Sequence, residues 1–393
     1  MALLNRFRRF DPSAYGFPKP LVPLLPQPNI LLPLLRKGVE YQTIDEDRNV
    51  LFYARGRYAL FEAYKQAGIG ASTCLLMPAY HCRTMVDPAV RLGADILFYR
   101  QSESLVPDLQ HIRFLVQNAP SPVAALLLPH YFGFIQPTEA IAGFCRQHSI
   151  MLIEDCSHAY FKWYGGPSVG GRENYVIASP YKFIAAQEGG ILMMPVDHIN
   201  ALPAMRNPSW ASELGECLHW CRKILKKSRF NPSSLASSPK ISYQKAQYVE
   251  EPGQSLSRMY NLVEEGREGF RFSKWLISHI DRDEIAKSRR TNYRQWLDAV
   301  AKLPQCSPLF PELPVGIVPY MFPLLIELPD PHFFILKSLG VPIWRWDEMA
   351  VSDCPVAASY STRLLHLPCH QTLSRQEMSW MIGVVSNVMN GKA

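Results

Sequence analysis

Between residues 57 and 195 the chain alternates between two patterns of apolar residues. Three segments carry apolar residues at helical spacing, and they predict helices over 57–68, 83–93 and 138–149. Short apolar runs predict strands over 74–78, 95–99, 122–133, 150–155, 174–180 and 189–195. Strands that alternate with helices through short connections indicate an α/β sandwich with a mainly parallel central sheet.

The flanking segments predict three regions. Residues 1–45 are rich in proline and indicate an arm that lies over a surface. A large domain over 46–255 follows, and its Ser-, Pro- and Lys-rich end at 200–255 lacks clear periodicity and is interpreted as an irregular excursion. Residues 256–393 contain a long helical pattern at about 258–300, a strand pattern at 319–328 and a final helical pattern, which together predict a smaller domain.

A single lysine stands at the junction of two of the predicted strands. Lys182 follows the apolar run 174–180 and precedes the glycine pair Gly189-Gly190. Burial of an ammonium group favours the neutral amine, which is a nucleophile towards carbonyl groups. The alternative interpretation is that Lys182 points from a loop into solvent.

Three further groups of residues are expected on the same side of the predicted sheet as Lys182. Asp155 ends the run IMLIED, where a carboxylate is a metal ligand, a helix cap or a charge partner. Ser179 lies three residues before Lys182. Gly56 and Arg57 open a predicted helix, whose first amides and dipole favour a phosphate. Ligands of such sheets bind at the carboxyl ends of the strands, so these side chains are expected to converge.

Composition narrows the class of protein. Apolar residues make up 48% of the 393 residues and charged residues 19%, which is typical of a globular protein with a large core. The net charge of +7 suits an anionic substrate, and the basic clusters lack the interleaved aromatics of a single-strand nucleic-acid binder. Nine scattered cysteines form no zinc or disulfide pattern, and no signal peptide is evident, so we expect no metal and a cytoplasmic protein.

The three polar points suit pyridoxal 5′-phosphate (PLP). Its aldehyde requires a lysine, its ring nitrogen an anion, and its phosphate a helix N-terminus with hydroxyl groups. Three segments in this order also resemble the DegT/DnrJ/StrS family of PLP-dependent aminotransferases: LLMPAYHCRTMVDPAVRLGADILFY, LLLPHYFGFIQPTEAIAGFCRQHSIMLIEDCSHAYF and YKFIAAQEGGIL. The resemblance implies a transferase of fold type I, with a large domain built on a mainly parallel sheet, a smaller C-terminal α+β domain, and a homodimer.

The resemblance also implies roles for individual residues. Lys182 corresponds to the lysine that forms the Schiff base with the cofactor, and Asp155 to the acid that pairs with the ring nitrogen. His158 matches the residue beside the 3-oxygen. Gly56 and Arg57 match the pair whose amides hold the phosphate. Tyr80 is the expected ring-stacking residue by its chemistry, although in many members the aromatic residue stands at the position of Cys82.

The chain departs from the family pattern around the phosphate. Arg57 stands where relatives have a small hydroxyl residue, and Ile177 where they have a serine; Ser179 is a candidate replacement. Leu256 stands where relatives have an asparagine that reaches the phosphate from the neighbouring subunit. We expect the Arg57 guanidinium to bind the cofactor phosphate, while the alternative is that it binds an anionic group of the substrate.

Two residues are candidates for substrate contacts. His130 ends a predicted strand and is either a substrate contact or a hydrogen-bonded structural histidine. Arg345, in the segment WRWDE, is either a substrate-anion clamp or part of domain packing. The first functional hypothesis is transfer of an amino group, from glutamate or glutamine, to a keto sugar or related natural-product carbonyl. The alternatives are a PLP-dependent lyase or dehydratase and a non-catalytic homologue.

Overall fold

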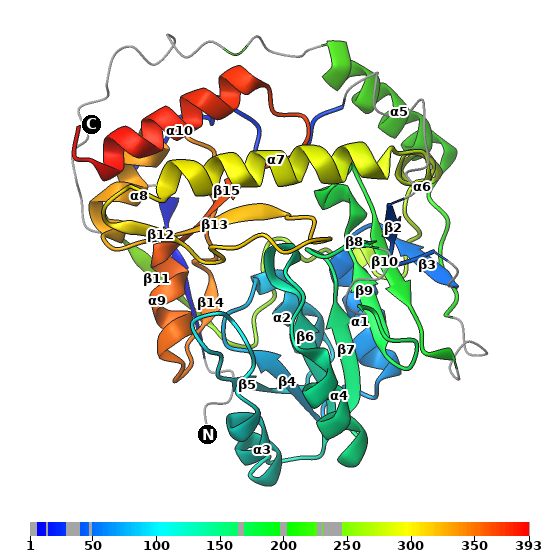
Figure 1. Ribbon diagram of the computed structural model, residues 1–393. Coiled ribbons are helices and arrows are strands. Elements are labelled where there is room, and N and C mark those ends of the chain that lie inside the picture. The colour runs from blue at the N-terminus through cyan, green and yellow to red at the C-terminus, as the bar shows by residue number, and fades with distance from the viewer. Residues whose placement is uncertain are drawn as a thin grey trace.

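The computed structural model describes residues 6–12, 15–28, 40–46, 49–163, 169–196, 203–225, 230 and 246–392. Its centre is a seven-stranded sheet with the order β3-β10-β9-β7-β6-β4-β5 (Figure 1). The strands are β3 (Val50–Tyr53), β4 (Cys74–Pro78), β5 (Asp95–Tyr99), β6 (Val123–Pro129), β7 (Met151–Asp155), β9 (Tyr175–Ala178) and β10 (Gly190–Met193). Five of them pair in parallel, and β10 is antiparallel to both of its neighbours. The expected mainly parallel sheet is therefore confirmed.

Helices cover both faces of this sheet, because alternate strand residues point to opposite sides. On one face, Leu76 and Leu126 pack with α3 (Leu109–Gln117) and α4 (Thr138–Gln147). On the other face, Leu75 and Leu127 belong to the core cluster that includes α1 (Gly56–Gln66) and α2 (Arg83–Arg91). Both faces are buried, which explains why the strands appear in the sequence as unbroken apolar runs.

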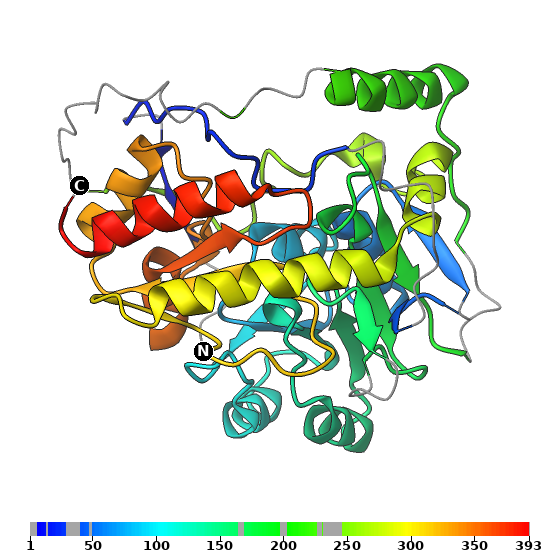
Figure 2. The ribbon, with the colours of Figure 1, turned by 45° about the horizontal axis from the view of Figure 1, so that its top comes forward.

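The C-terminal part forms smaller sheets and a helical layer. An antiparallel sheet contains β12 (Cys306–Pro308), β13 (Met321–Ile326) and β15 (Leu364–Pro368). The helices are α6 (Arg271–Ser278), α7 (Arg282–Val300), α8 (Pro329–Ser338), α9 (Pro355–Arg363) and α10 (Arg375–Met389). Helices α7 and α10 lie side by side above the large sheet (Figures 1 and 2). A further pair joins β2 (Tyr41–Thr43) to β8 (Phe161–Trp163).

The N-terminal arm packs on the C-terminal part of the same chain. Strand β1 (Arg6–Phe10) lies between β11 (Tyr248–Pro252) and β14 (Met349–Ala350) in a three-stranded sheet. Farther along the arm, the Leu21 amide donates to Gly340 O (3.0 Å). The arm therefore closes against segments that follow it by more than 200 residues.

Two predicted segments differ from the structure. The excursion at 200–255 contains α5 (Trp210–Leu225), a helix at the edge of the molecule (Figures 1 and 2), so its interpretation as irregular is wrong there. Much of the rest of that excursion lies outside the described residues. The predicted long helix at 258–300 is two helices, α6 and α7, because Asp281 caps a new helix by accepting from the Glu284 amide.

Candidate active site

A cavity of about 200 Å³ lies at the carboxyl ends of β7 and β9, beside the N-terminus of α1. Its lining includes Asp155, Ser157, His158, Ser179 and Lys182. Gly56 and Arg57 line it from α1. The structure thus brings together six of the residues that the sequence singled out, from segments spread over more than 120 residues.

Asp155 is the last residue of β7, and its side chain is 3% exposed. One carboxylate oxygen accepts the Ser157 amide (2.8 Å). This bond fixes the carboxylate at the wall of the cavity. It also means that Asp155 has a local structural role, so a test of its chemical role has to separate the negative charge from the hydrogen-bond acceptor.

Lys182 lies in a short 3₁₀ turn, Pro180–Lys182, directly after β9. Its Nζ atom is 5.5 Å from the centre of the Tyr320 ring. The Gly189-Gly190 pair after the lysine loop has a structural reason: a Cβ on Gly190 would lie 2.2 Å from the backbone carbon of Arg55. The glycine allows β10 to pass against the start of α1, which closes the loop around Lys182.

Two neutral histidines flank the amino group of Lys182. Burial, together with the nearby Lys182 charge, holds the pKa of His158 well below its usual range. The same two causes lower the pKa of His366 to about 3. His158 stacks on Tyr320 with 4.2 Å between ring centres, and its Nδ1 accepts the Phe132 amide (3.3 Å). A neutral His158 therefore carries its proton on Nε2.

Two serine hydroxyls lie beside the first turn of α1. The Oγ atoms of Ser157 and Ser179 are 3.0 Å apart, and both side chains are buried. A Cβ on Gly56 would lie 2.3 Å from the Ser179 hydroxyl, so a side chain there would displace that hydroxyl. The N-cap residue Arg55 makes no side-chain hydrogen bond to the first turn of the helix. Hydroxyl groups and uncapped helix amides are the groups that bind anions in proteins.

Arg57 lies at the edge of the cavity, and its guanidinium donates to the Met259 carbonyl. The segment that carries Met259 is held to the same chain, because Ser257 donates through its hydroxyl (2.5 Å) and its amide (3.0 Å) to Asp87. One guanidinium bond leaves further N–H groups on Arg57 for an anion.

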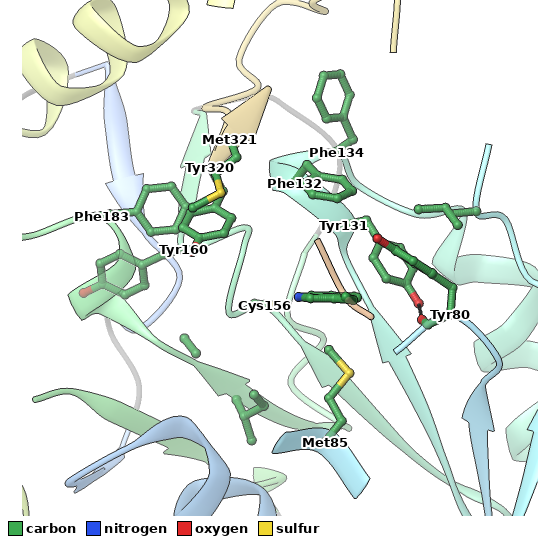
Figure 3. Close-up of a cluster of buried hydrophobic side chains, with 14 of the residues drawn as sticks. Tyr80, Met85, Tyr131, Phe132, Phe134, Cys156, Tyr160, Phe183, Tyr320 and Met321 are labelled. Carbon is green, nitrogen blue, oxygen red and sulfur yellow. Dashed lines mark hydrogen bonds between the residues drawn. The ribbon is translucent and has the colours of Figure 1, made fainter. Parts of the chain in front are cut away.

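Tyr80 does not line the cavity, and its role as the ring-stacking residue stays a prediction. Its side chain is fully buried and packs on Tyr131 (5.9 Å) and Trp346 (5.0 Å), as Figure 3 shows for Tyr131. Its hydroxyl bonds to Nε2 of His366 (3.0 Å). Cys82, two residues later, lines the cavity at the position where many relatives carry the aromatic residue.

His130 is a structural histidine. Its Nε2 atom lies 3.1 Å from the Glu154 carboxylate, and its Nδ1 accepts the Gln136 amide (3.1 Å). Burial raises the pKa of Glu154, but hydrogen bonds to His130, Asn174 and the Gly171 amide outweigh it and bring the pKa to about 2. His130 is not part of the cavity lining, and its hydrogen bonds support the structural alternative.

Arg345 is also turned away from the cavity. It pairs with Asp347 (3.2 Å) and lies 3.6 Å above the Phe333 ring, which is the packing role that the sequence left open. Its neighbours Trp344 and Trp346 do line the cavity. The WRWDE segment therefore contributes the aromatic rings of Trp344 and Trp346 to the site, and not the guanidinium of Arg345.

Sequence reasoning missed several lining residues. His366 and Ser157 carried a signal: a lone histidine in the apolar run LLHLP, and a hydroxyl between Asp155 and His158. Leu24 and Leu25 of the N-terminal arm also line the cavity, and nothing local in the proline-rich arm indicated it.

The segment that builds this site matches a known family. Residues 44–210 match the model described as the DegT/DnrJ/EryC1/StrS aminotransferase family. These residues form a DegT/DnrJ/EryC1/StrS domain. All of the lining residues that come from β7, β9 and the start of α1 fall within it.

Two curated relatives share parts of this domain. The chain is 32% identical over 71 residues to a putative L-glutamine:3-amino-2,3-dideoxy-scyllo-inosose aminotransferase of Micromonospora echinospora, a match that covers 18% of this chain and 17% of that protein. It is 26% identical over 149 residues to the GDP-perosamine synthase of Vibrio cholerae, which covers 37% of this chain and 40% of that protein. The chain thus spans less than half of the length of either relative.

Solved structures share the fold of the DegT/DnrJ/EryC1/StrS domain and of most of the remaining chain. The aminotransferase TlmJ from Streptoalloteichus hindustanus superposes with a TM-score of 0.60 at 17% identity, over 88% of this chain and 86% of that one. PseC of Helicobacter pylori, an aminotransferase involved in the biosynthesis of pseudoaminic acid, superposes with a TM-score of 0.60 at 14% identity. That match covers 93% of this chain and 100% of that one. The expected transferase fold is confirmed.

Proposed function

We propose that this protein is a PLP-dependent aminotransferase that transfers an amino group, from glutamate or glutamine, to a keto sugar or a related natural-product carbonyl. The observation that carries the proposal is the convergence of Asp155, Lys182 and the anion site at Gly56 in one cavity. The matches to sugar and natural-product aminotransferases support the reaction class.

The residues of the cavity fit the cofactor. Asp155 would hold the ring nitrogen, and the α1 amides with Ser157 and Ser179 would hold the phosphate. His158 would donate its Nε2 proton to a cofactor oxygen. The Gly56 position supports this assignment, because a side chain there would fill the space beside Ser179. When bound, PLP supplies a ring that withdraws electrons from a carbon bearing an amino group.

The protein's own groups then manage the proton of that carbon. The Lys182 amine takes the proton as a general base and returns it as a general acid, a role that is worth about 10²–10⁴ in rate for positioned side chains. Tyr320 and the two neutral histidines surround the amine and add no competing charge. Leu24, Leu25 and Trp344 provide an apolar wall that limits the access of water.

An absorbance spectrum tests the proposal. Purified protein mixed with PLP is expected to gain a band near the edge of the visible range, and glutamate is expected to convert this band to that of the pyridoxamine form. A band that forms but does not respond to glutamate, glutamine or other amino donors would contradict amino transfer while leaving cofactor binding in place.

We predict that Arg57→Thr weakens the binding of PLP by about tenfold or more, because a hydrogen bond to a charged group contributes about 1.5–3 kcal/mol. The substrate KM is expected to change little. PLP titration followed by absorbance measures the first quantity and steady-state kinetics the second. Arg113→Thr, at an exposed position of α3, is the matched control. Unchanged PLP affinity with a raised substrate KM would assign Arg57 to the substrate.

We also propose a homodimer, which rests on the family resemblance. The residues themselves no longer argue for it, because the arm and the segment around Ser257 find their partners within the same chain. Light scattering at micromolar concentration is expected to give twice the mass of the chain. A fully active monomer would contradict the dimer. The cytoplasmic location stays a prediction from the scattered thiols; among the described residues, no helix is long and apolar enough to cross a membrane.

A further inference from the structure

Helix α5 carries an exposed apolar stripe. Trp210, Leu214, Leu218 and Leu225 are 79%, 62%, 48% and 85% exposed, and Cys221 is exposed between them. At about 100° of rotation per residue, these five side chains fall within an arc of about 80° on the helix. Scattered apolar residues on a surface are ordinary, but an aligned set along one whole helix indicates a binding face.

A different side of α5 attaches the helix to the body. Glu216 is buried and accepts from the Ser273 hydroxyl (3.3 Å), and the Trp220 indole donates to the Ala185 carbonyl (3.0 Å). Trp220 also packs edge-on against Phe272 of α6, with 5.7 Å between ring centres. The helix lies at the periphery in both views (Figures 1 and 2). The stripe is therefore not needed to hold α5 in place.

Cationic side chains border the stripe. Arg222 is exposed at the C-terminal end of α5, about 40° beyond the edge of the stripe, and the Arg271 guanidinium lies 5.4 Å from the centre of the Trp210 ring at the other end. The two carboxylates of the helix are engaged elsewhere: Glu213 accepts the Arg271 amide (2.8 Å), and Glu216 is buried. The sequence continues with Lys226, Lys227 and Arg229, which lie outside the described residues.

We propose that α5 binds the surface of an anionic lipid bilayer, with the stripe inserted among the headgroups and the bordering cations on the lipid phosphates. A helix with an apolar face ending in Trp and Leu and a basic border has the composition of helices that lie in the membrane interface. A second copy of the chain is the competing occupant of the stripe, and the experiment below separates the two. The inference is independent of the reaction in the cavity.

Vesicle sedimentation tests this inference with the full-length protein. We expect binding to vesicles of phosphatidylcholine with phosphatidylglycerol, and much weaker binding to pure phosphatidylcholine. Leu214→Glu with Leu218→Glu is expected to weaken binding to the anionic vesicles at least tenfold. Val315→Glu is the matched control, because Val315 is 70% exposed and lies outside α5.

Separate variants test how much the basic side chains contribute to vesicle binding. Arg222→Gln is expected to weaken binding to anionic vesicles about fivefold and to reduce the effect of salt, whereas Lys223→Gln, on the opposite side of the helix, is expected to weaken binding less. Equal loss in the Val315→Glu control, or no binding to anionic vesicles, would overturn the inference. So would an oligomer that the double Leu variant dissociates in the absence of lipid, since that result would assign the stripe to a second copy.

Discussion

Lys182→Ala is expected to abolish amino transfer and to remove the absorbance band that the protein gains with PLP. The physical reason is that alanine has no nitrogen to bond to the cofactor aldehyde and no group to carry the substrate proton. The rate is expected to fall by at least the 10²–10⁴-fold typical of a lost general acid–base group. Absorbance of the mixture with PLP and an assay with glutamate measure the two effects.

Lys65→Ala is the matched control, because Lys65 is exposed near the end of α1 and does not line the cavity. It is expected to keep both the band and the activity. A Lys182→Ala protein with an unchanged spectrum would mean that another group holds the cofactor. Because Lys182 also lines a cavity with two buried histidines, circular dichroism has to show that the variant is folded.

The second large effect is expected at Asp155. Asp155→Asn keeps an oxygen to accept the Ser157 amide but removes the negative charge, whereas Asp155→Ala removes both. If the charge pairs with the cofactor's ring nitrogen, both variants lose about ten- to hundredfold in rate, equivalent to about 1.5–3 kcal/mol. Single-turnover measurements with glutamate follow this step directly.

The comparison of the two variants separates chemistry from structure. An active Asp155→Asn with an inactive, unstable Asp155→Ala would show that Asp155 only holds the turn at Ser157. Thermal unfolding of both proteins measures the structural part. Asp95→Asn, at the start of the edge strand β5, serves as the control for removal of one carboxylate charge.

The core of the fold was predictable because its signals are local. Runs such as CLLMP (74–78) and DILFY (95–99) are short and mostly apolar, and both are strands with those limits. The lysine between two such runs was a weaker signal, because the same pattern also fits a lysine that points from a loop into solvent.

The parts that were missed depend on contacts between distant segments. Tyr80 was favoured over Cys82 by its chemistry, and only the tertiary packing of Tyr80 on Trp346 and His366 shows that Cys82 lines the cavity and Tyr80 does not. Helix α5 was hidden because its apolar residues lie at an exposed face and its flanks are rich in serine and proline. Sequence periodicity reports which face of a segment is apolar, but not which partner covers it.

The N-terminal arm has a consequence for the order in which the protein is made. Leu24 and Leu25 form part of the cavity wall. Two hydrogen bonds hold the arm around them: one joins Nε2 of His370 to Pro23 O (2.9 Å), and in the other the Gln27 amide donates to the hydroxyl of Thr372, which lies 345 residues later in the chain. At about 5–20 residues per second, roughly 20–70 s of synthesis separate the arm from these anchors. During that time the domain that holds Lys182 is already made, while the wall has nothing to fasten to. Leu24 and Leu25 can therefore close their side of the cavity only after the segment around His370 and Thr372 has been made.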